Sequence, residues 1–501
     1  MLTRLTRAAA ALLLTLAAPS AAQADRPITA EALMRHIEVL AGDDFEGRLP
    51  ATEGERRTIS YIATQLQARG VEPAAAGGGW FQAVTLLERR PVSHDVRWTA
   101  NGRRLAFDER RITLIGSEAG QRIADAPLVF VGHGVVDPAR GIDQLAGADL
   151  EGAVALMLVE PPPVPDFPSF RSRVRAVASA GASAVIGIVD DSIPWQAVVA
   201  AGADGETVVD IGGVPAVFGS MPAGEAARLV RAAGGDLASL LNEQAGPSFR
   251  AVPLDLRATL YVRSHVRRYT SHNVVGRLRG RESGGESVLV LGHWDHLGIC
   301  RPEGTDRICN GAVDNASGIA TLIEVAGRLA RGRRPERDVL FLATTAEEIG
   351  LLGAEFFAAR PPVALETIVA ALNLDTVAVN PAGTPLGVVG RGIPALDEAI
   401  AAVAAEMGRT MDTGHGADAF VRRQDGWALS RAGVPAVLVG GNLVATEALR
   451  FFLATAYHSP VDEPGGEIEL GGAVGDANLL VALARRLATP ALYRRPQSRP
   501  M

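Results

Sequence analysis

The sequence of 501 residues contains no lysine, so all 49 of its basic residues are arginines. This absence excludes enzymes that form a Schiff base through a lysine amine, and it excludes lysine-dependent phosphate-binding P-loops. The sequence also has no GxSxG or GxGxxG match, which disfavours serine hydrolases of that type and dinucleotide-binding proteins. Because the formal net charge is -7, no basic surplus is present to neutralise phosphates, and we expect no nucleic-acid partner.

Cysteine is almost absent from the sequence. Its two cysteines, Cys300 and Cys309, lie nine positions apart in the polar segment CRPEGTDRIC. We expect them to form a disulfide, because an exported protein can keep such a pair oxidised. The alternative, a cysteine metal site, is disfavoured because two cysteines without nearby partner ligands make only half a site.

Apolar runs long enough to cross a membrane are also missing. The N-terminal segment has Arg4 and Arg7, an apolar run of eleven residues over 8–18, and then Ala22-Gln23-Ala24. This pattern predicts a cleavable signal peptide over residues 1–24, with cleavage after Ala24. The alternative is a short membrane anchor, but a span needs about 20 residues. We therefore expect a secreted or periplasmic protein with no membrane span in its mature form.

The length and composition indicate a folded protein of two or three domains. Hydrophobic residues make up 48% and charged residues 21%, as in ordinary globular proteins. Short apolar runs broken by glycine and proline predict a β-rich α/β module over residues 97–267. We expect this module to be inserted into a discontinuous domain of residues 25–96 and 268–495, followed by a tail over 496–501.

The discontinuous domain shows alternating strand and helix patterns. Amphipathic stripes predict two helices near the N-terminus, around residues 33–41 and 59–66, and a third from Ser317 to just before Gly332. Nearly continuous apolar runs predict strands buried on both faces, at residues 287–292, 338–345, 367–374 and 435–441. The expected fold class is therefore α/β, with a mostly parallel mixed sheet between helices in three layers, plus the inserted module.

Residue types that bind metals follow these predicted strands. They are three of the nine histidines and five carboxylates: His293, Asp295, His296, Asp314, Glu347, Glu348, Asp375 and His458. In open α/β sheets ligands bind beyond the carboxyl ends of the strands, so we expect these side chains to converge there. Carboxylates so close together would repel one another unless cations neutralised them. Nitrogen and oxygen donors without cysteine favour zinc, with cobalt or manganese as alternatives.

Five motifs resemble one known family. GHWDHLG, NGAVDNASGIA, TTAEEIGLLGA, LNLD and YHSPVDE occur in the order and spacing of the co-catalytic zinc exopeptidases, which include bacterial leucyl aminopeptidases, aminopeptidase Y and glutamate carboxypeptidase II. The similarity covers the C-terminal part and, more weakly, DDFEGRLPATEGERRTISYIATQL near the N-terminus. The middle module resembles the protease-associated domain that several members insert at this place.

The resemblance implies a site with two zinc ions and a peptide substrate. In this pattern Asp314 bridges the two ions, His293 and Asp375 complete one set of ligands, and Glu348 and His458 complete the other. Glu347 then corresponds to the general base, which acts on a metal-bridging hydroxide, and a non-proline cis peptide is expected at Asp314–Asn315.

Two further residues of the first motif have implied roles. Asp295 corresponds to the carboxylate that accepts the imidazole N–H of His293. His296 is expected to be structural. His133 and His415 are expected to be ordinary loop or strand histidines outside the site.

The function implied is that of an aminopeptidase, a hydrolase that removes N-terminal residues from peptides. A carboxypeptidase or dipeptidase of the same family is the first alternative, because no residue in the sequence is identified as the reader of a free amine or a free carboxylate. A glutaminyl cyclase-like transferase with one zinc is the second, and the presence of His293 beside Asp295 disfavours it. A non-catalytic receptor-like ectodomain is the third, but such a protein should have lost ligands.

Overall fold

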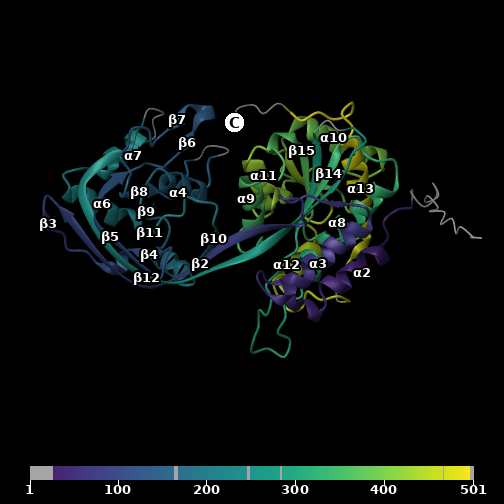
Figure 1. Cartoon of the computed structure of the whole chain (residues 1–501), viewed down its shortest axis with the longest axis horizontal. Helices are drawn as coiled ribbons and strands as arrows, with labels where there is room; N and C mark the ends of the chain where they lie inside the picture. The colour runs from purple at the N-terminus through teal and green to yellow at the C-terminus, as the bar shows by residue number, and fades with distance from the viewer. Residues whose placement is uncertain (1–25, 163–166, 245–248, 283–284, 466–467, 497–501) are drawn as a thin grey trace, which may run out of the picture.

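The computed structural model of the chain describes residues 26–162, 167–244, 249–282, 285–465 and 468–496. These residues fold into two lobes that share one 15-stranded mixed sheet (Figure 1). In the first lobe the strand order is β16-β17-β15-β13-β14-β12, and in the second it continues from β12 as β5-β8-β9-β11-β4. The predicted α/β class with a mixed sheet is confirmed. The expected signal peptide over residues 1–24 lies outside the described residues.

Two long antiparallel strands connect the lobes. They are β2 (Phe81–Ala100) and β12 (Val252–Leu278), which pair along nearly the whole of β2 with one irregularity between Arg263 and Ser264. Figure 1 shows them as a twisted ribbon that arches from the first lobe into the second. Both strands run without a break through the positions, near residues 96 and 267, at which the sequence suggested domain boundaries.

The central strands of the first lobe are those predicted from the apolar runs. The parallel strands β13 (Ser287–His293), β14 (Asp338–Thr344), β15 (Ile368–Asn373) and β17 (Ala436–Gly440) lie side by side, with the antiparallel strands β12 and β16 (Gly387–Val389) beyond them. Successive side chains point to opposite faces: Val288 and Val290 pack in one core, Leu289 and Leu291 in another. Their carboxyl ends therefore meet at one edge.

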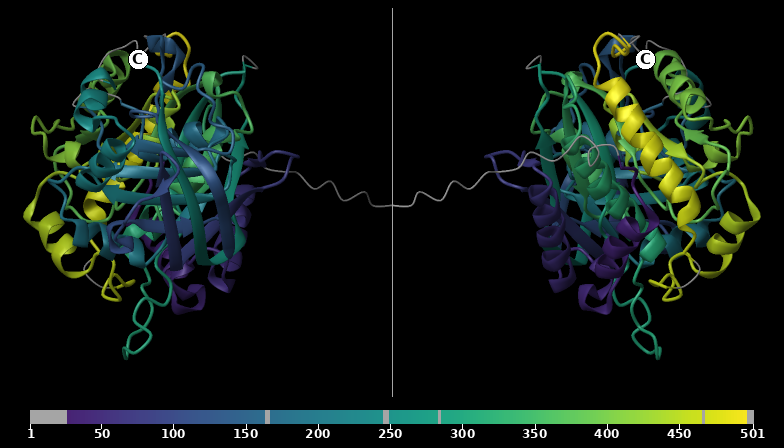
Figure 2. Two further views of the ribbon diagram at one scale, coloured as in Figure 1. Left: turned by 90° about the vertical axis from the view of Figure 1, so that its left-hand side faces the viewer. Right: turned by 90° about the vertical axis from the view of Figure 1, so that its right-hand side faces the viewer.

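Helices cover both faces of this sheet, as the three-layer prediction requires. One face carries α2 (Ala30–Leu40), α3 (Glu53–Ala68), α8 (Ser317–Arg331), α10 (Pro394–Glu406), α12 (Glu447–Thr455) and α13 (Leu470–Leu487), and α13 is prominent in the right-hand view of Figure 2. The other face carries α9 (Leu352–Ala359) and α11 (Gly426–Arg431). Helix α2 begins where the Thr29 hydroxyl accepts the backbone N–H of Ala32, and it buries Leu33, Ile37 and Leu40.

The second lobe has the same layering on a smaller scale. Its strands are β4 (Thr113–Gly116), β5 (Gly120–Phe130), β8 (Val154–Leu158), β9 (Ala184–Val189) and β11 (Val217–Pro222). Helices α6 (Ala223–Ala232) and α7 (Leu237–Gln244) pack on one face and α4 (Phe170–Ser179) packs on the other; α5 (Trp195–Ala203) has no buried residue.

The remaining elements are short. They are β1 (Glu72–Pro73), β3 (Arg103–Arg104), β6 (Val136–Asp137), β7 (Ile142–Asp143), β10 (Glu206–Val209), and the turns η1 (Asp43–Arg48), η2 (Glu109–Arg111), η3 (Pro138–Arg140), η4 (Ala312–Ala316), η5 (Leu365–Thr367) and η6 (Gly416–Phe420). No helix in the described part of the chain has the length and apolar character needed to cross a bilayer.

Candidate metal centre and active site

The sheet of the first lobe brings the predicted site residues to one edge. His293 is the last residue of β13, Glu347 and Glu348 follow the end of β14, and Asp375 follows the end of β15. Two further loops complete the group: Asp314 lies in η4, just before α8, and His458 lies after α12. The topology therefore gathers residues that are separated by up to 165 positions in the sequence.

Asp314 lies at the centre of this group. Its Oδ1 is 3.3 Å from His293 Nε2, and its Oδ2 is 3.4 Å from His458 Nε2. His293 Nε2 is also 3.5 Å from Asp375 Oδ1, while His458 Nε2 is 2.9 Å from Glu348 Oε2. One carboxylate thus faces two histidines, and each histidine faces a further carboxylate. The Asp314–Asn315 peptide bond is cis, as expected.

The donor atoms are close enough to hold metal. His293, Asp314 and Glu348 can each place one donor atom within 4.8 Å of the others, and so can His293, Glu347 and Asp375. The donors are imidazole nitrogens and carboxylate oxygens, which suit zinc. Most of them are buried, so the negative charges have little water to screen them. The residues present therefore fit the metal that the sequence suggested.

Burial and mutual contacts shift the pKa values of the site residues, upwards for Glu347 and His458 and downwards for Asp314. Burial raises the pKa of Glu347 well above its usual range, although nearby His293 opposes this. Burial would also raise the pKa of Asp314, but hydrogen bonds with His293 and His458 hold it well below its usual range. Burial lowers the pKa of His458, but hydrogen bonds to Asp314 and Glu348 outweigh it and raise the pKa to about 9.

Asp295 supports the site in a different way from the one expected. His293 Nδ1 lies 3.2 Å from the backbone oxygen of Asp295 and 3.9 Å from its carboxylate, so the carboxylate is not the acceptor of a close imidazole hydrogen bond. Instead, its two oxygens accept the backbone N–H groups of Glu347 (3.1 Å) and Glu348 (3.4 Å). Asp295 therefore fixes the loop that presents the two glutamates. Burial raises its pKa to about 7.

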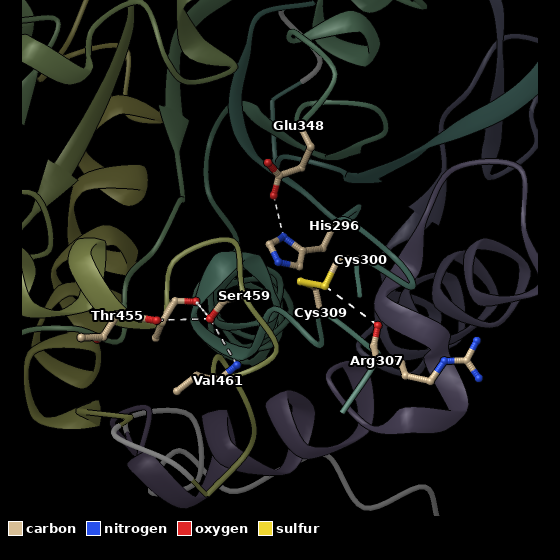
Figure 3. The surroundings of a disulfide bond; sticks show 9 residues. His296, Cys300, Arg307, Cys309, Glu348, Thr455, Ser459 and Val461 are labelled. Atoms are coloured by element: carbon tan, nitrogen blue, oxygen red, sulfur yellow. Dashed lines mark hydrogen bonds and ion pairs between the residues drawn. A yellow bond between two sulfur atoms is a disulfide. The ribbon is translucent and has the colours of Figure 1, made fainter. Parts of the chain in front are cut away.

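His296 lies against the site. Its Nδ1 is 2.5 Å from Glu348 Oε1 (Figure 3). Its ring also packs edge to face on His458, with 5.8 Å between the ring centres. The two oxygens of Glu348 are thus divided between His296 and His458. We expected His296 to be structural, and its contact with Glu348 orients that predicted metal ligand. His133 and His415 lie away from this group, the first buried in the second lobe and the second exposed.

The Cys300–Cys309 disulfide forms as expected, close to His296 (Figure 3). It closes the base of the loop between the segments that carry His293 and Asp314, where Gly298 and Cys309 also pair as an isolated β-bridge. The loop projects from the body of the first lobe in both views of Figure 2.

Two supporting residues were not identified from the sequence. Arg48 in η1 is fully buried and donates to the backbone oxygens of Trp294 (2.8 Å), Asn310 (2.5 Å) and Gly311 (2.8 Å). It thereby joins the segment after β13 to the segment before Asp314. Arg48 belongs to the short sequence EGR, which lies about 250 positions before the two segments that it joins. This short sequence does not resemble a metal-binding motif, so nothing in it indicated the role.

Asp462 is the second such residue. It is buried, and its carboxylate accepts the backbone N–H groups of Val313 (2.8 Å) and Asp314 (3.0 Å). This contact fixes the Asp314 loop against the segment that carries His458. Asp462 belongs to the YHSPVDE motif, so that motif was the available signal.

A small cavity of about 40 Å³ contains part of the cluster. Its lining combines carboxylates with apolar or aromatic residues, which are Phe420, Leu443, Leu449, Leu453 and Tyr457. A larger cavity of about 450 Å³ lies against the opposite face of α12, beside Phe451, Phe452 and Thr455. The smaller cavity is the one that contains the donor atoms, so we place the site there.

Comparison with known proteins agrees with this chemistry. The family model "Peptidase family M28" matches residues 273–470. A probable zinc metalloprotease of Pyrenophora teres f. teres is 36% identical over 104 residues, which cover 21% of this chain and 22% of that protein. A probable glutamate carboxypeptidase of Arabidopsis thaliana is 32% identical over 140 residues, which cover 27% and 18%. The chain thus spans about a quarter or less of the curated relatives it matches.

Solved structures that resemble the chain include two aminopeptidases. An aminopeptidase from Aneurinibacillus sp. strain AM-1 gives a TM-score of 0.46 at 20% identity, with 95% of this chain and 97% of that chain covered. A zinc aminopeptidase from Bacillus subtilis gives 0.44 at 16% identity, with 95% and 97% covered. The family match extends from β12 to the start of α13 and includes every predicted metal ligand, so this part of the chain is similar to peptidase family M28.

Proposed function

We propose that the chain is a zinc exopeptidase whose site holds two zinc ions, and that it acts as an aminopeptidase on peptides. The observation that carries this proposal is the position of Asp314, whose two carboxylate oxygens face two different histidines. In the proposed assignment His293 and Asp375 hold one ion, Glu348 and His458 hold the other, and Asp314 is shared.

The charges of the proposed ligands support two ions. Bound zinc supplies Lewis acidity, which polarises a peptide carbonyl and makes water more acidic. Asp314, Glu348 and Asp375 together carry -3, which a single zinc would leave partly uncompensated in a buried site. A single-zinc cyclase-like site would also not need a carboxylate between two histidines, so the arrangement disfavours that alternative.

In this proposal Glu347 is the general base. It lines the cavity, its Oε2 is 4.0 Å from His293 Nε2, and burial raises its pKa. A carboxylate of raised pKa can take a proton from the attacking water and return it to the departing amine. The carboxylate of Asp295 accepts the backbone N–H groups of Glu347 and of the neighbouring ligand Glu348. It thereby fixes the backbone from which the two side chains project.

The acidic lining of the cavity supports aminopeptidase activity, because a negative potential there suits a free α-ammonium group. A dipeptidase or carboxypeptidase is a second candidate, and one observation favours it. Arg423, a cationic side chain that suits a carboxylate, also lines the cavity.

Two broader features belong to the same proposal. The pattern of residues 1–24 and the disulfide support export to the periplasm or the medium. The second lobe, with its own β-rich α/β core between residues 97 and 267, supports a protease-associated module inserted into the peptidase domain.

Adjacent glutamates provide the test. Glu347→Gln should keep the zinc content of the wild type but lower kcat by about a hundredfold to ten-thousandfold, because only the proton acceptor is removed. Glu348→Gln is the matched control: it makes the same chemical change one residue away, and it should lose bound zinc. Zinc by atomic absorption and hydrolysis of leucine p-nitroanilide should be measured on the same preparations.

Asp314→Ala should lose more zinc than Glu348→Gln, because it removes the shared ligand. An active Glu347→Gln enzyme would contradict the assignment of the base. Two zinc ions per chain retained by Asp314→Ala would contradict the shared-ligand site.

A further inference from the structure

Arg423 introduces a positive charge into the wall of the candidate active site. The cavity is lined by His293 and by the carboxylates of Asp314, Glu347 and Asp375. The lining also includes apolar and aromatic residues, together with Arg423 and Gln424. An arginine in the wall of a substrate cavity can recognise an anionic group, because its planar guanidinium offers several N–H donors in a fixed fork.

Contacts with aromatic residues hold Arg423 in place. Its Nη2 donates to the Tyr457 hydroxyl at 3.4 Å, and its guanidinium carbon lies 5.8 Å from the centre of the Phe420 ring. Tyr457 in turn stacks on His458, with 3.8 Å between the ring centres. This chain of contacts places the guanidinium beside the proposed metal ligands without bonding it to them.

Arg423 is exposed, and its charged contact within the protein is with the Phe420 ring rather than with an acid. Within the described residues no carboxylate lies at ion-pair distance from it, although many other arginines of the chain have such partners. Among the described residues, Arg423 is therefore a cation of the cavity wall without a carboxylate partner.

We propose that Arg423 binds a carboxylate of the substrate, so that the preferred substrates are peptides with a carboxylate near the scissile bond. This inference rests on the proposed function and specifies its substrate class. A guanidinium can form two parallel hydrogen bonds with one carboxylate. The carboxylate can come from two sources, the α-carboxylate of a dipeptide or the side chain of an N-terminal acidic residue.

The experiment uses two pairs of substrates that differ in one charge each. Ala-Leu and Ala-leucinamide differ in the α-carboxylate, and glutamyl p-nitroanilide and glutaminyl p-nitroanilide differ in the side-chain carboxylate. The zinc-loaded full chain and two variants, Arg423→Gln and Arg422→Gln, are compared by kcat/KM. Arg422 is the matched control, because it is the neighbouring exposed arginine, lies over Trp427 and does not line the cavity.

We expect the wild type to prefer the acidic member of one pair, and the identity of that pair assigns the source. In that pair Arg423→Gln should reduce the acid-to-amide ratio of kcat/KM by about tenfold to a hundredfold, since a hydrogen bond to a charged group is lost. The change should fall mainly on KM. Arg422→Gln should preserve the ratio, which controls for the loss of one positive charge from the surface.

Three outcomes overturn the inference. Hydrolysis of both pairs without preference for the acid overturns it and leaves the proposed function standing. An equal change of the ratio in Arg423→Gln and Arg422→Gln overturns it as well, because the effect would then be that of general charge. If the zinc-loaded wild type hydrolyses none of the four substrates, the proposed function fails and the inference fails with it.

Discussion

Arg48 is a buried cation whose hydrogen bonds all end on backbone carbonyls. Besides the three bonds to the ligand-bearing segments, its Nη1 donates to the oxygen of Leu40 (2.8 Å), at the C-terminal end of α2. A cation at that place also interacts favourably with the helix dipole. Burial lowers the pKa of Arg48 to about 10, so it remains charged at neutral pH. One side chain thus joins α2 to both segments of the site.

Replacing this residue should damage both folding and metal binding. We expect Arg48→Met to lower the free energy of unfolding of the metal-free protein by about 3 kcal/mol or more, because it leaves several buried carbonyls without a donor. The variant should also release zinc at lower chelator concentrations than the wild type. Denaturant titration and chelator titration measure the two effects. Arg35→Met, at an exposed arginine of α2, is the control and should change neither.

His133 gives a second effect at the scale of one residue, in the second lobe. It is buried, its ring packs edge to face on Phe167, and its Nδ1 has no hydrogen-bond partner among the described residues. Burial, helped by nearby Arg173, lowers its pKa from 6.5 to about 4. The folded protein therefore disfavours the protonated imidazole, whereas the unfolded chain accepts the proton near pH 6.5.

The sign of the pH dependence follows. The stability associated with neutral His133 is fully present above about pH 6.5 and is lost as the pH falls towards 4, by up to about 3 kcal/mol. We expect His133→Phe, which keeps a ring but cannot be protonated, to lose less stability than the wild type over this interval. Urea unfolding at several pH values checks this. His265→Gln, at an exposed histidine of β12, should leave the wild-type slope unchanged, and parallel slopes for His133→Phe and wild type would contradict the prediction.

At the scale of elements, the disulfide-closed loop matters because of what it connects. It leaves β13 shortly after His293 and returns just before Asp314, and η1 packs against its base. Gly47 of η1 has φ +62°, and a Cβ there would lie 2.4 Å from the oxygen of Cys309, so no side chain fits between them. The base of the loop is therefore tightly packed even though its tip projects.

Opening the disulfide should destabilise this arrangement. For so short a loop the chain-entropy model gives a contribution of about 2.5 to 3 kcal/mol. We expect the double variant Cys300→Ser and Cys309→Ser to lose about this much stability in denaturant, compared with the oxidised wild type. Reduced wild type is the matched control and should unfold like the variant. If the oxidised wild type and the variant have equal stability, strain offsets the bond and the prediction is wrong.

The buried elements of the first lobe were predictable from the sequence, and the long connecting strands were not. β13, β14, β15 and β17 are covered on both faces, so their sequences are continuous apolar runs. β2 and β12 have exposed residues at alternate positions, many of them arginines, and a search for apolar runs does not detect them. The middle module was therefore recognised by its own core, but its continuity with the first sheet was not.

In the site, too, some residues could be predicted from the sequence and others could not. All the predicted ligands converge because each belongs to a motif at the end of a strand or beside a helix, where the sequence order fixes the place in space. Arg48 and Arg423 could not be assigned in this way, because their roles depend on contacts with distant segments. Asp295 was found, but its main partners are the backbone N–H groups of Glu347 and Glu348, which no spacing in the sequence indicates.

At the scale of the whole molecule, each lobe has its own cores on a common sheet, and one smaller cluster joins Val209 of the second lobe to Ala346 and Leu352 of the first. The cores of the first lobe contain residues of α8 and β13, and those of the second contain residues of α6 and β8. Side chains from the second lobe also reach the first: Arg171 donates to the oxygen of Gly350 (3.2 Å), and Arg175 pairs with Glu355 (3.3 Å). Gly350 lies three positions after Glu347, so the lobes meet beside the loop that presents the proposed base.

The shared ribbon of β2 and β12 determines how such a molecule can deform. A flexible single-chain tether would let the lobes swing apart freely, but here separation requires the rupture of a continuous ladder of backbone hydrogen bonds. The side chains that cross from the second lobe to the loop after β14 add to this restraint. Wide opening of the two lobes should therefore be resisted both by the paired strands and by these contacts.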